Sequence, residues 1–309
     1  MFMKILKPRF ISPELKLLRF LHSRMKFPVD DLRRYENLEK GFKGEQQFDK
    51  WSEDILIDGL ILNDLLYEVN KTVFQIDSVL ISQGTLFQFE VKNFEGDYYI
   101  DGDKWLTLSG STIKNPLHQL ERSETMLKQL LQNSGHNMHI ESYLVFINPN
   151  FHLYNAPINQ SIIFPTQLSR FLDKLNRISS KLTGRHSKLA EYLVSVQTFQ
   201  SPYKRLPNYE YDQLAKGICC PRCRGFTDET LKCKCGFEGA PAAAILRSVE
   251  EFRWLFPDEK ITTNGVYEWC GGNRSVRTIR RILSSNFEYE GYGKSGHFIV
   301  PTGLTKEIR

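Results

Sequence analysis

The chain has 309 residues, of which 41% are hydrophobic and 25% charged, and its formal net charge is +5. This length and apolar content suit two or three globular domains and argue against a single small domain. The charge is uneven, because residues 1–40 carry ten Lys or Arg against five Asp or Glu, residues 41–212 carry 16 against 20, and residues 213–309 carry 15 against 11. The positive surplus therefore lies at the two ends of the chain.

The sequence predicts neither a membrane span nor a signal peptide. No run of eighteen apolar residues occurs, and charged residues and prolines interrupt the first eighteen positions. We therefore expect a cytoplasmic protein that has no membrane partner.

Two helices are predicted in the first sixty residues. Residues 12–27 place leucines at helical spacing and basic residues elsewhere, which predicts an arm that packs on the core; contact with phosphates is the alternative. A second helix is expected from about Gly44 to Ile57, with Phe48 and Trp51 on one stripe. Glu45 then lies near the beginning of this helix. The positive end of a helix stabilises a carboxylate there, so Glu45 needs no functional role to explain its position.

A strand over residues 60–69 precedes a predicted β-hairpin over residues 75–94. Two β-rich runs flank the short polar turn Ser-Gln-Gly. With the turn centred on its last two residues, Asp77 falls opposite Glu90, and directly opposed residues share a face with Cβ atoms roughly 4.5 to 5.5 Å apart. Lys92 joins Glu90 on that face, while Phe89 and Val91 point the other way.

The facing acids predict a cation site. Two opposed carboxylates repel each other unless a cation lies between them, and a hard ion such as Mg²⁺ prefers oxygen ligands. The alternative is a solvated surface triplet of Asp77, Glu90 and Lys92. The apolar neighbours on both strands instead predict a buried hairpin, in which charged groups need partners.

The following elements predict an α/β core. A hairpin over residues 97–108 turns at Asp101-Gly102-Asp103 and directs Trp105 into the core. Asn115 caps a helix that runs to about residue 132 and carries Gln119. Strands over residues 141–148 and 161–164, then helices over 166–175 and 187–199, complete a mixed central sheet flanked by helices. The proline-bearing stretch 200–208 marks a domain boundary.

Five of the six cysteines fall within seventeen residues. Cys220 and Cys223 form a Cys-x-x-Cys knuckle, and Cys233 and Cys235 supply a second pair, so four thiolates can complete a closed tetrahedral Zn²⁺ site. The Cys-x-Cys half departs from the usual spacing, and Cys219 competes for a place. A segment this small lacks another core, so we expect structural zinc rather than free thiols.

Residues 240–300 predict three helices and a β-hairpin, which resembles a winged helix-turn-helix. The helices are expected over 242–256, 263–269 and from about residue 273. The third directs Val276, Ile279, Ile282 and Leu283 inward. Its outward positions and the hairpin supply the expected nucleic-acid contacts Arg274, Arg277, Arg280, Arg281 and Lys294. A solvated face, or a surface that grips another protein, is the alternative.

Several of these segments together resemble the nuclease-related domain (NERD) family of the PD-(D/E)xK nuclease superfamily. The resemblance covers about residues 35–175. It rests on Lys43-Gly44-Glu45, Gln75-Ile76-Asp77, Phe89-Glu90-Val91-Lys92-Asn93-Phe94-Glu95-Gly96, Trp105 and Asn115-Pro116-Leu117-His118-Gln119. It implies a restriction-endonuclease-like fold and a nuclease activity that depends on Mg²⁺ or Mn²⁺.

The resemblance also implies roles for individual residues. Asp77 and Glu90 hold the metal, with the carbonyl of Val91 as a further ligand, and Lys92 orients or deprotonates the water or stabilises charge on the phosphate. Glu45 matches the first acid of the family's site, and Gln119 hydrogen-bonds the water or a phosphate oxygen. Alternatively, Gln119 caps a neighbouring strand.

The expected organisation is an N-terminal helical arm (1–34), a nuclease-like domain (35–178), a helix and linker (179–212), a zinc ribbon (213–240) and a winged-helix-like domain (241–309). We expect a Mg²⁺-dependent nuclease that cuts DNA and is targeted by its C-terminal module. One alternative is a non-catalytic nucleic-acid-binding or regulatory protein on the same scaffold. Another is that the C-terminal module docks a protein partner or a second copy of the chain.

Overall fold

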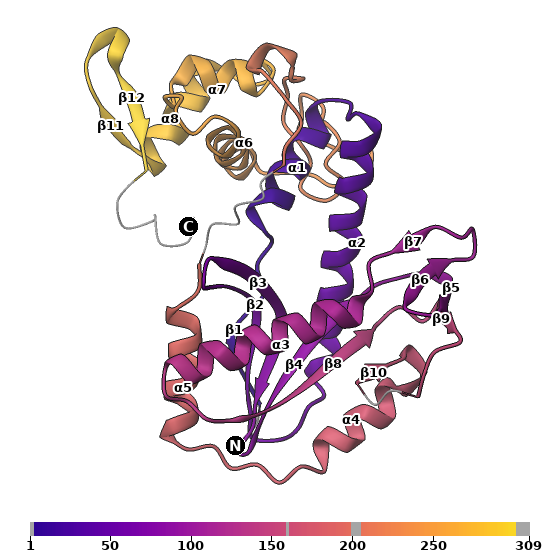
Figure 1. The fold of residues 1–309 in the computed structure, drawn as a ribbon. Helices are drawn as coiled ribbons and strands as arrows, with labels where there is room; N and C mark the ends of the chain where they lie inside the picture. Colours follow the sequence, from indigo (N-terminus) through magenta and orange to yellow (C-terminus); the bar gives the residue numbers. More distant parts are fainter. Residues whose placement is uncertain (1–2, 159–160, 199–204, 301–309) are drawn as a thin grey trace. The chain divides into compact units, whose positions relative to one another are not determined.

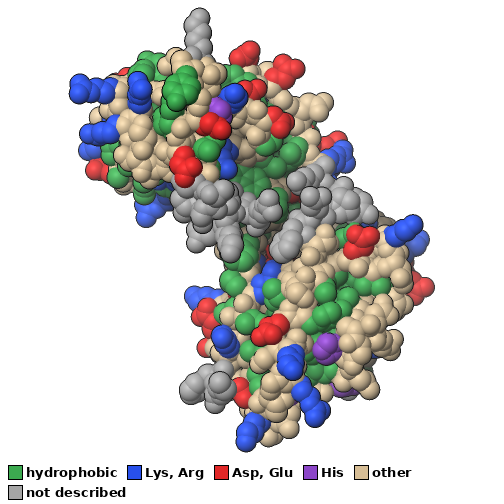
Figure 2. All heavy atoms as spheres, turned by 90° about the vertical axis from the view of Figure 1, so that its left-hand side faces the viewer, with side chains coloured by type: hydrophobic (Ala, Val, Ile, Leu, Met, Phe, Trp, Pro, Cys, Tyr) green, Lys and Arg blue, Asp and Glu red, His purple; other side chains and the backbone are tan. Residues whose placement is uncertain are grey.

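The computed structural model describes residues 3–158, 161–198 and 205–300 (Figure 1). The chain forms two compact units: unit 1 comprises residues 1–11 and 36–203, and unit 2 comprises residues 12–35 and 204–309. None of the described helices combines the length and the apolar character that crossing a membrane requires. Figure 2 shows one face of the molecule, on which apolar, basic and acidic side chains are intermingled.

Unit 1 is built around a six-stranded sheet in the order β1-β2-β3-β4-β8-β10. Neighbouring strands are antiparallel from β2 to β4, whereas β1 pairs parallel with β2, and β8 pairs parallel with both β4 and β10. The strands are β1 (Lys4–Lys7), β2 (Leu60–Val69), β3 (Thr72–Ile81), β4 (Thr85–Lys92), β8 (His139–Phe146) and β10 (Ile162–Ile163). The predicted mixed central sheet is thus confirmed.

Helices cover both faces of this sheet (Figure 1). Leucines of α3 and α5 share a hydrophobic cluster with β2 and β3. On the other face, Phe48 of α2 and Phe171 of α4 pack with Phe87, Phe89 and Val91 of β4. The helices are α2 (Val29–Ser52), α3 (Pro116–Asn133), α4 (Leu168–Asn176), α5 (Gly184–Ser195) and the short η1 (Pro165–Gln167). The predicted α/β class is therefore confirmed.

A smaller sheet in the order β7-β6-β5-β9 follows β4. Its strands are β5 (Gly96–Asp101), β6 (Lys104–Thr107), β7 (Thr112–Ile113) and β9 (Phe151–Tyr154). The predicted hairpin is confirmed by the antiparallel pairing of β5 with β6, and Trp105 is buried in the cluster beneath this sheet. β7 and β9 were not predicted from the sequence.

The predicted start of the second helix is wrong. α2 begins at Val29 rather than near Gly44 and ends at Ser52, so Glu45 lies in the helix interior. The explanation of Glu45 as a carboxylate at a helix N-terminus therefore fails. Gly41 and Gly44 suggest a break, but a long helix tolerates glycine at about 1 kcal/mol each when packing elsewhere holds it.

Among the described residues, unit 2 contains the helices α1, α6, α7 and α8 and the first residues of α2. Its elements are α1 (Pro13–Arg24), η2 (Tyr211–Gln213), α6 (Pro241–Leu255), α7 (Thr263–Trp269), α8 (Val276–Asn286), β11 (Glu288–Glu290), η3 (Gly293–Ser295) and β12 (His297–Ile299). The three helices and the antiparallel β11–β12 hairpin follow one another in the predicted order. Ile279, Ile282 and Leu283 are buried as predicted, but Val276 is not: it is 43% exposed, because it is the first residue after the Ser275 cap.

The first helix packs within the hydrophobic core of unit 2. Leu17 and Leu21 of α1 belong to a cluster with residues of α6 and α7 in unit 2. The buried Arg24 adds an ion pair to Glu251 of α6 (2.7 Å) and donates to the carbonyls of Ala215 and Gly217. Because a buried charge needs such partners, α1 is an integral part of unit 2.

Candidate active site

The register of β3 and β4 agrees with the predicted hairpin. Ser78 pairs with Phe89, so the next residues outward are Asp77 and Glu90. Phe89 and Val91 lie in the cluster with α2 and α4, whereas Gln88 on the opposite face donates to Ser123 of α3. Glu90 and Lys92 follow Gln88 at alternate positions and therefore lie on the α3 side.

Hydrogen bonds join these residues to one another and to α3. Lys92 Nζ donates to Glu90 Oε1 (2.6 Å) and to Gln119 Oε1 of α3 (3.1 Å). Asp77 Oδ2 accepts from the backbone N–H of Val91 (2.8 Å). The Glu90 side chain is only 2% exposed. Gln119 thus contacts the side chain of Lys92, the last residue of β4. The alternative of a surface triplet is wrong for Asp77 and Glu90, which are both buried.

Burial and mutual repulsion make it unfavourable for the carboxylates of this cluster to be ionised. Burial, and then the negative charge of Asp77, raise the pKa of Glu90 to about 7. Burial also raises the pKa of Asp77, although Lys92 and the Val91 N–H act in the opposite direction. Burial alone would lower the pKa of Lys92, but the carboxylates of Glu90 and Asp77 outweigh it and raise that pKa. A cation that approached the carboxylates would relieve their repulsion.

Glu45 joins the site through a residue that the sequence did not single out. Arg9 donates to Glu45 Oε2 (2.7 Å), to both carboxylate oxygens of Asp49 (2.9 and 3.0 Å) and to the backbone carbonyl of Asp77 (2.9 Å). Burial, followed by the charge of Asp77, raises the pKa of Glu45 to about 8 despite this ion pair. The contacts of Arg9 span 36 to 68 residues of sequence, so no local spacing could reveal them.

A glycine and an asparagine bring α2 close to the end of β4. A Cβ added to Gly44 would lie 2.4 Å from the Cβ of Asn93. Asn93 in turn donates to the Lys40 carbonyl of α2 (2.7 Å) and accepts from the side chain of Asn148 (3.0 Å). Gly44 therefore permits the close approach that places its neighbour Glu45 beside Asp77.

We expect Gly44→Ala to lower the stability of unit 1 by about 1–3 kcal/mol, because the added methyl group must displace Asn93 and the helix. Gly41→Ala is the matched control in the same helix, since a Cβ there meets nothing within 4 Å. That control should be neutral or stabilising by up to about 1 kcal/mol. Urea unfolding of both variants checks this, and equal effects of the two substitutions would contradict it.

The donor set fits a hard divalent cation such as Mg²⁺ or Mn²⁺. Both ions bind carboxylate oxygens, and the hydrogen bonds above use only one oxygen each of Asp77 and Glu90. In the described part of the chain, however, these carboxylates do not form a group of three or more closely spaced metal ligands. The side chains would thus have to close around an ion. The carbonyl of Val91 stays a predicted ligand.

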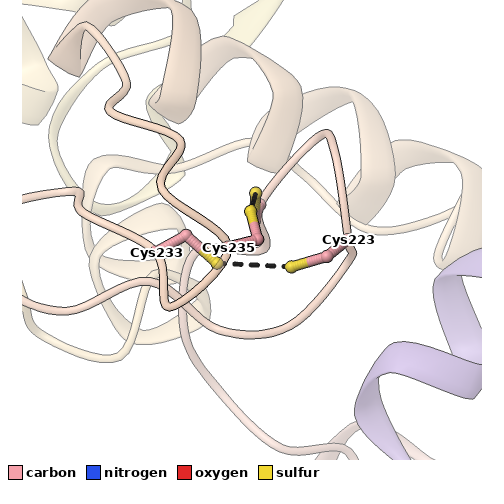
Figure 3. Close-up of side chains that lie close together, drawn as sticks. Cys223, Cys233 and Cys235 are labelled. Atoms are coloured by element: carbon pink, nitrogen blue, oxygen red, sulfur yellow. Dashed lines mark hydrogen bonds between the residues drawn. The ribbon is translucent and has the colours of Figure 1, made fainter.

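A second candidate site is formed by four cysteines of unit 2. The sulfurs of Cys220, Cys223, Cys233 and Cys235 all lie within 4.8 Å of one another. Cys223 and Cys233 point toward each other with sulfurs 3.3 Å apart (Figure 3), and Cys220 and Cys235 are 3.7 Å apart. Four sulfurs bound to zinc at ~2.3 Å in a tetrahedron lie at about this spacing. The predicted cluster is confirmed and fits Zn²⁺.

Cys219 is excluded from this cluster. Cys219 is half-buried, and burial raises the pKa of its thiol to about 12, which opposes the thiolate form that binds metal. For Cys220, burial acts to raise the pKa, but hydrogen bonds, chiefly from the backbone N–H groups of Cys223 and Arg222, outweigh it and lower the pKa to about 7. The fold therefore makes Cys220, rather than Cys219, the fourth candidate zinc ligand.

Three of the five predicted nucleic-acid contacts lie on one exposed face of α8. Arg277, Arg280 and Arg281 are exposed at spacings of three and four, which places them side by side. Arg274 precedes the helix and is half-buried, with a buried Nε that lacks a hydrogen-bond partner among the described residues. The side chain of Lys294 lies outside the described part of the structure.

Residues 40–147 match the family model of NERD, the nuclease-related domain. The match includes Glu45, Asp77, Glu90, Lys92 and Gln119, and it excludes Arg9 and the cysteine cluster. No curated protein matches this chain. The crystal structure of protein VC1899 from Vibrio cholerae is 11% identical and covers 60% of this chain, which spans about half (52%) of that protein; its TM-score of 0.24 is too low to support a conclusion. The chain therefore contains a nuclease-related domain.

Proposed function

We propose that this chain is a divalent-metal-dependent nuclease that hydrolyses phosphodiester bonds of DNA. The observation that supports this most strongly is the cluster of Asp77, Glu90 and Lys92, in which two buried acids lie close together and burial raises the pKa of both. The match of residues 40–147 to a nuclease-related domain implies a nucleic-acid substrate. A phosphodiester brings further negative charge, so the site needs a cation to accept it.

Each side chain then has a role. Asp77 and Glu90, with the Val91 carbonyl, would hold Mg²⁺ or Mn²⁺, which when bound stabilises negative charge on a phosphate and lowers the pKa of water. Lys92, held by Glu90 and Gln119, would orient or deprotonate the attacking water or stabilise the charge that grows on the phosphate. Glu45 and Gln119 assist from α2 and α3.

The direct test is a cleavage assay with the zinc-replete full chain. Single-stranded, duplex and branched DNA, together with RNA, are incubated with Mg²⁺, Mn²⁺, Ca²⁺ or EDTA. We expect cleavage of DNA with Mg²⁺ or Mn²⁺ and none with EDTA. A folded protein that cuts no substrate with either ion would contradict the proposal.

The alternative is a non-catalytic nucleic-acid-binding protein on this scaffold. It is favoured by the contacts that Asp77 and Lys92 already make within the protein, which could stabilise the fold without turnover. Under this alternative, the wild type cuts nothing, and substitution of Glu90 or Lys92 leaves DNA affinity unchanged.

The arginines of α8 are proposed to contact DNA phosphates as part of a winged-helix-like module. The double substitution Arg277→Gln/Arg280→Gln should then weaken DNA binding and reduce the slope of log K against log salt concentration by about 2, since each phosphate contact contributes ~0.9. Fluorescence anisotropy over a salt series measures both quantities.

Arg185 and Lys188 provide the matched control. They are exposed on α5 at the same spacing of three, so Arg185→Gln/Lys188→Gln removes two charges from unit 1. We expect this pair to leave the slope unchanged. If the α8 variant also leaves affinity and slope unchanged, the module docks a protein or a second copy of the chain instead.

A further inference from the structure

We propose that Arg9 is a positioning residue of the nuclease-like site, which fixes Glu45 of α2 against the backbone of β3 at Asp77. The inference rests on the function proposed above and assigns a role to a residue outside the matched range 40–147. Arg9 acts through the carboxylate that it holds.

The guanidinium of Arg9 is built into the site. Its side chain is 3% exposed, and all three of its nitrogens donate hydrogen bonds. Two of them grip Asp49 in a bidentate pair, which fixes the plane of the group. The remaining bonds go to Glu45 on α2 and to the Asp77 carbonyl on β3. One side chain thus ties together α2 and β3, which carry three of the acids.

The segment that carries Arg9 is itself anchored. β1 pairs parallel with β2, and Lys7 Nζ donates to the carbonyls of Asn63 (2.6 Å) and Asp64 (2.5 Å). Asp64 has a φ of +54°, an unusual conformation for a residue other than glycine. Lys7 therefore binds the irregular point of β2, opposite Asp77, and places Arg9 two residues later with little freedom.

The charges of the cluster explain why the acids need both Arg9 and a metal ion. Glu45, Asp49, Asp77 and Glu90 carry four negative charges when ionised, whereas Arg9 and Lys92 carry two positive ones. The difference of two is what one divalent ion neutralises. Without Arg9, the acids of α2 would face Asp77 unpaired, and their repulsion would move Glu45 away from β3.

A lysine at this position keeps the charge but cannot make the bidentate contact or reach three acceptors in one plane. We therefore expect Arg9→Lys to lower kcat by about 10- to 100-fold, the usual cost of removing a supporting contact, with KM for DNA within about threefold. A double-mutant cycle with Glu45→Gln tests whether Arg9 acts through Glu45. In the Glu45→Gln background, Arg9→Lys should cost at most a further factor of about three.

The same double-mutant cycle can be measured without turnover, from the increase in Tm that Mn²⁺ causes in each variant. An ion that binds only the folded protein raises Tm. Arg9→Lys should shift the Mn²⁺ concentration at half-maximal stabilisation, and the shift should not increase in the double variant. Arg34→Lys is the control, since Arg34 pairs with Glu14 in unit 2 and should change neither readout.

The outcomes separate this inference from the proposed function. The role of Arg9 is overturned if Arg9→Lys lowers kcat by the same factor in the wild-type and Glu45→Gln backgrounds. It is also overturned if Arg9→Lys leaves the Mn²⁺ concentration at half-maximal stabilisation unchanged. Both outcomes count against Arg9 even if the wild type cleaves DNA. A non-additive Mn²⁺ cycle in a protein that cuts nothing supports Arg9 and contradicts the nuclease. If Arg9→Lys does not fold, Asp49→Asn provides the same cycle, because it loosens Arg9 but leaves its contact with Glu45.

Discussion

Replacement of Glu90 by glutamine is expected to lower the rate of Mg²⁺-dependent DNA cleavage by about 10³-fold. The amide is neutral, so it cannot supply the negative charge that holds a divalent ion, and Lys92 loses the carboxylate that lies 2.6 Å from its Nζ. Glutamine has nearly the same shape and removes one charge from a buried group of like charges, so we expect the variant to fold.

Single-turnover cleavage measures this loss, and anisotropy with Ca²⁺ in place of Mg²⁺ measures DNA binding. We expect binding to remain within about threefold of wild type, since one buried carboxylate adds little to phosphate contacts made elsewhere. Glu68→Gln is the control, because Glu68 is an exposed glutamate of β2 in the same sheet. Equal cleavage by the two variants would refute the assignment of Glu90 as a metal ligand.

Removal of zinc is expected to unfold residues 218–239 and to destabilise unit 2 by several kcal/mol, since structural zinc binds with apparent free energies of about 10–16 kcal/mol. Among the described residues, this segment is held by the isolated bridges Cys219–Phe226 and Lys232–Glu238 rather than by regular strands. Its Ile218 and Leu231 also belong to the cluster formed by α6, α7 and α8. Loss of the ion thus exposes part of that core.

Metal analysis should find one zinc per chain in the wild type and none in Cys235→Ser, whose Tm should fall. Cys219→Ser should retain one zinc, because its thiol lies outside the cluster. Retention of zinc by Cys235→Ser together with its loss from Cys219→Ser would show that the assignment of ligands is wrong.

The parts of the site that the sequence revealed are those set by local rules. The β3–β4 register follows from a short turn and side-chain alternation, and it brings Asp77 opposite Glu90 without reference to the rest of the chain. The cysteine cluster follows from ligand spacing in the same way. Both depend on fewer than twenty residues.

The parts that were missed depend on tertiary structure. The contact of Arg9 with Glu45 requires the parallel pairing of β1 with β2, which joins segments about fifty-six residues apart and has no local signal. Likewise, the amphipathic pattern of α1 indicates that it packs on something, but it cannot say that the partner is α6 and Trp269. The start of α2 was missed because glycine weakens a helix only slightly.

The assignment of residues 12–35 to unit 2 changes how this protein can be dissected. A fragment that ends near residue 203 still carries α1, whose Leu17 and Leu21 lose the aromatic and aliphatic side chains that cover them, and whose Arg24 loses Glu251. Such a fragment should be prone to aggregation for reasons unrelated to the nuclease-like sheet. A fragment that keeps residues 1–11 and 36–203 and omits residues 12–35 retains every residue of the three hydrophobic clusters of unit 1.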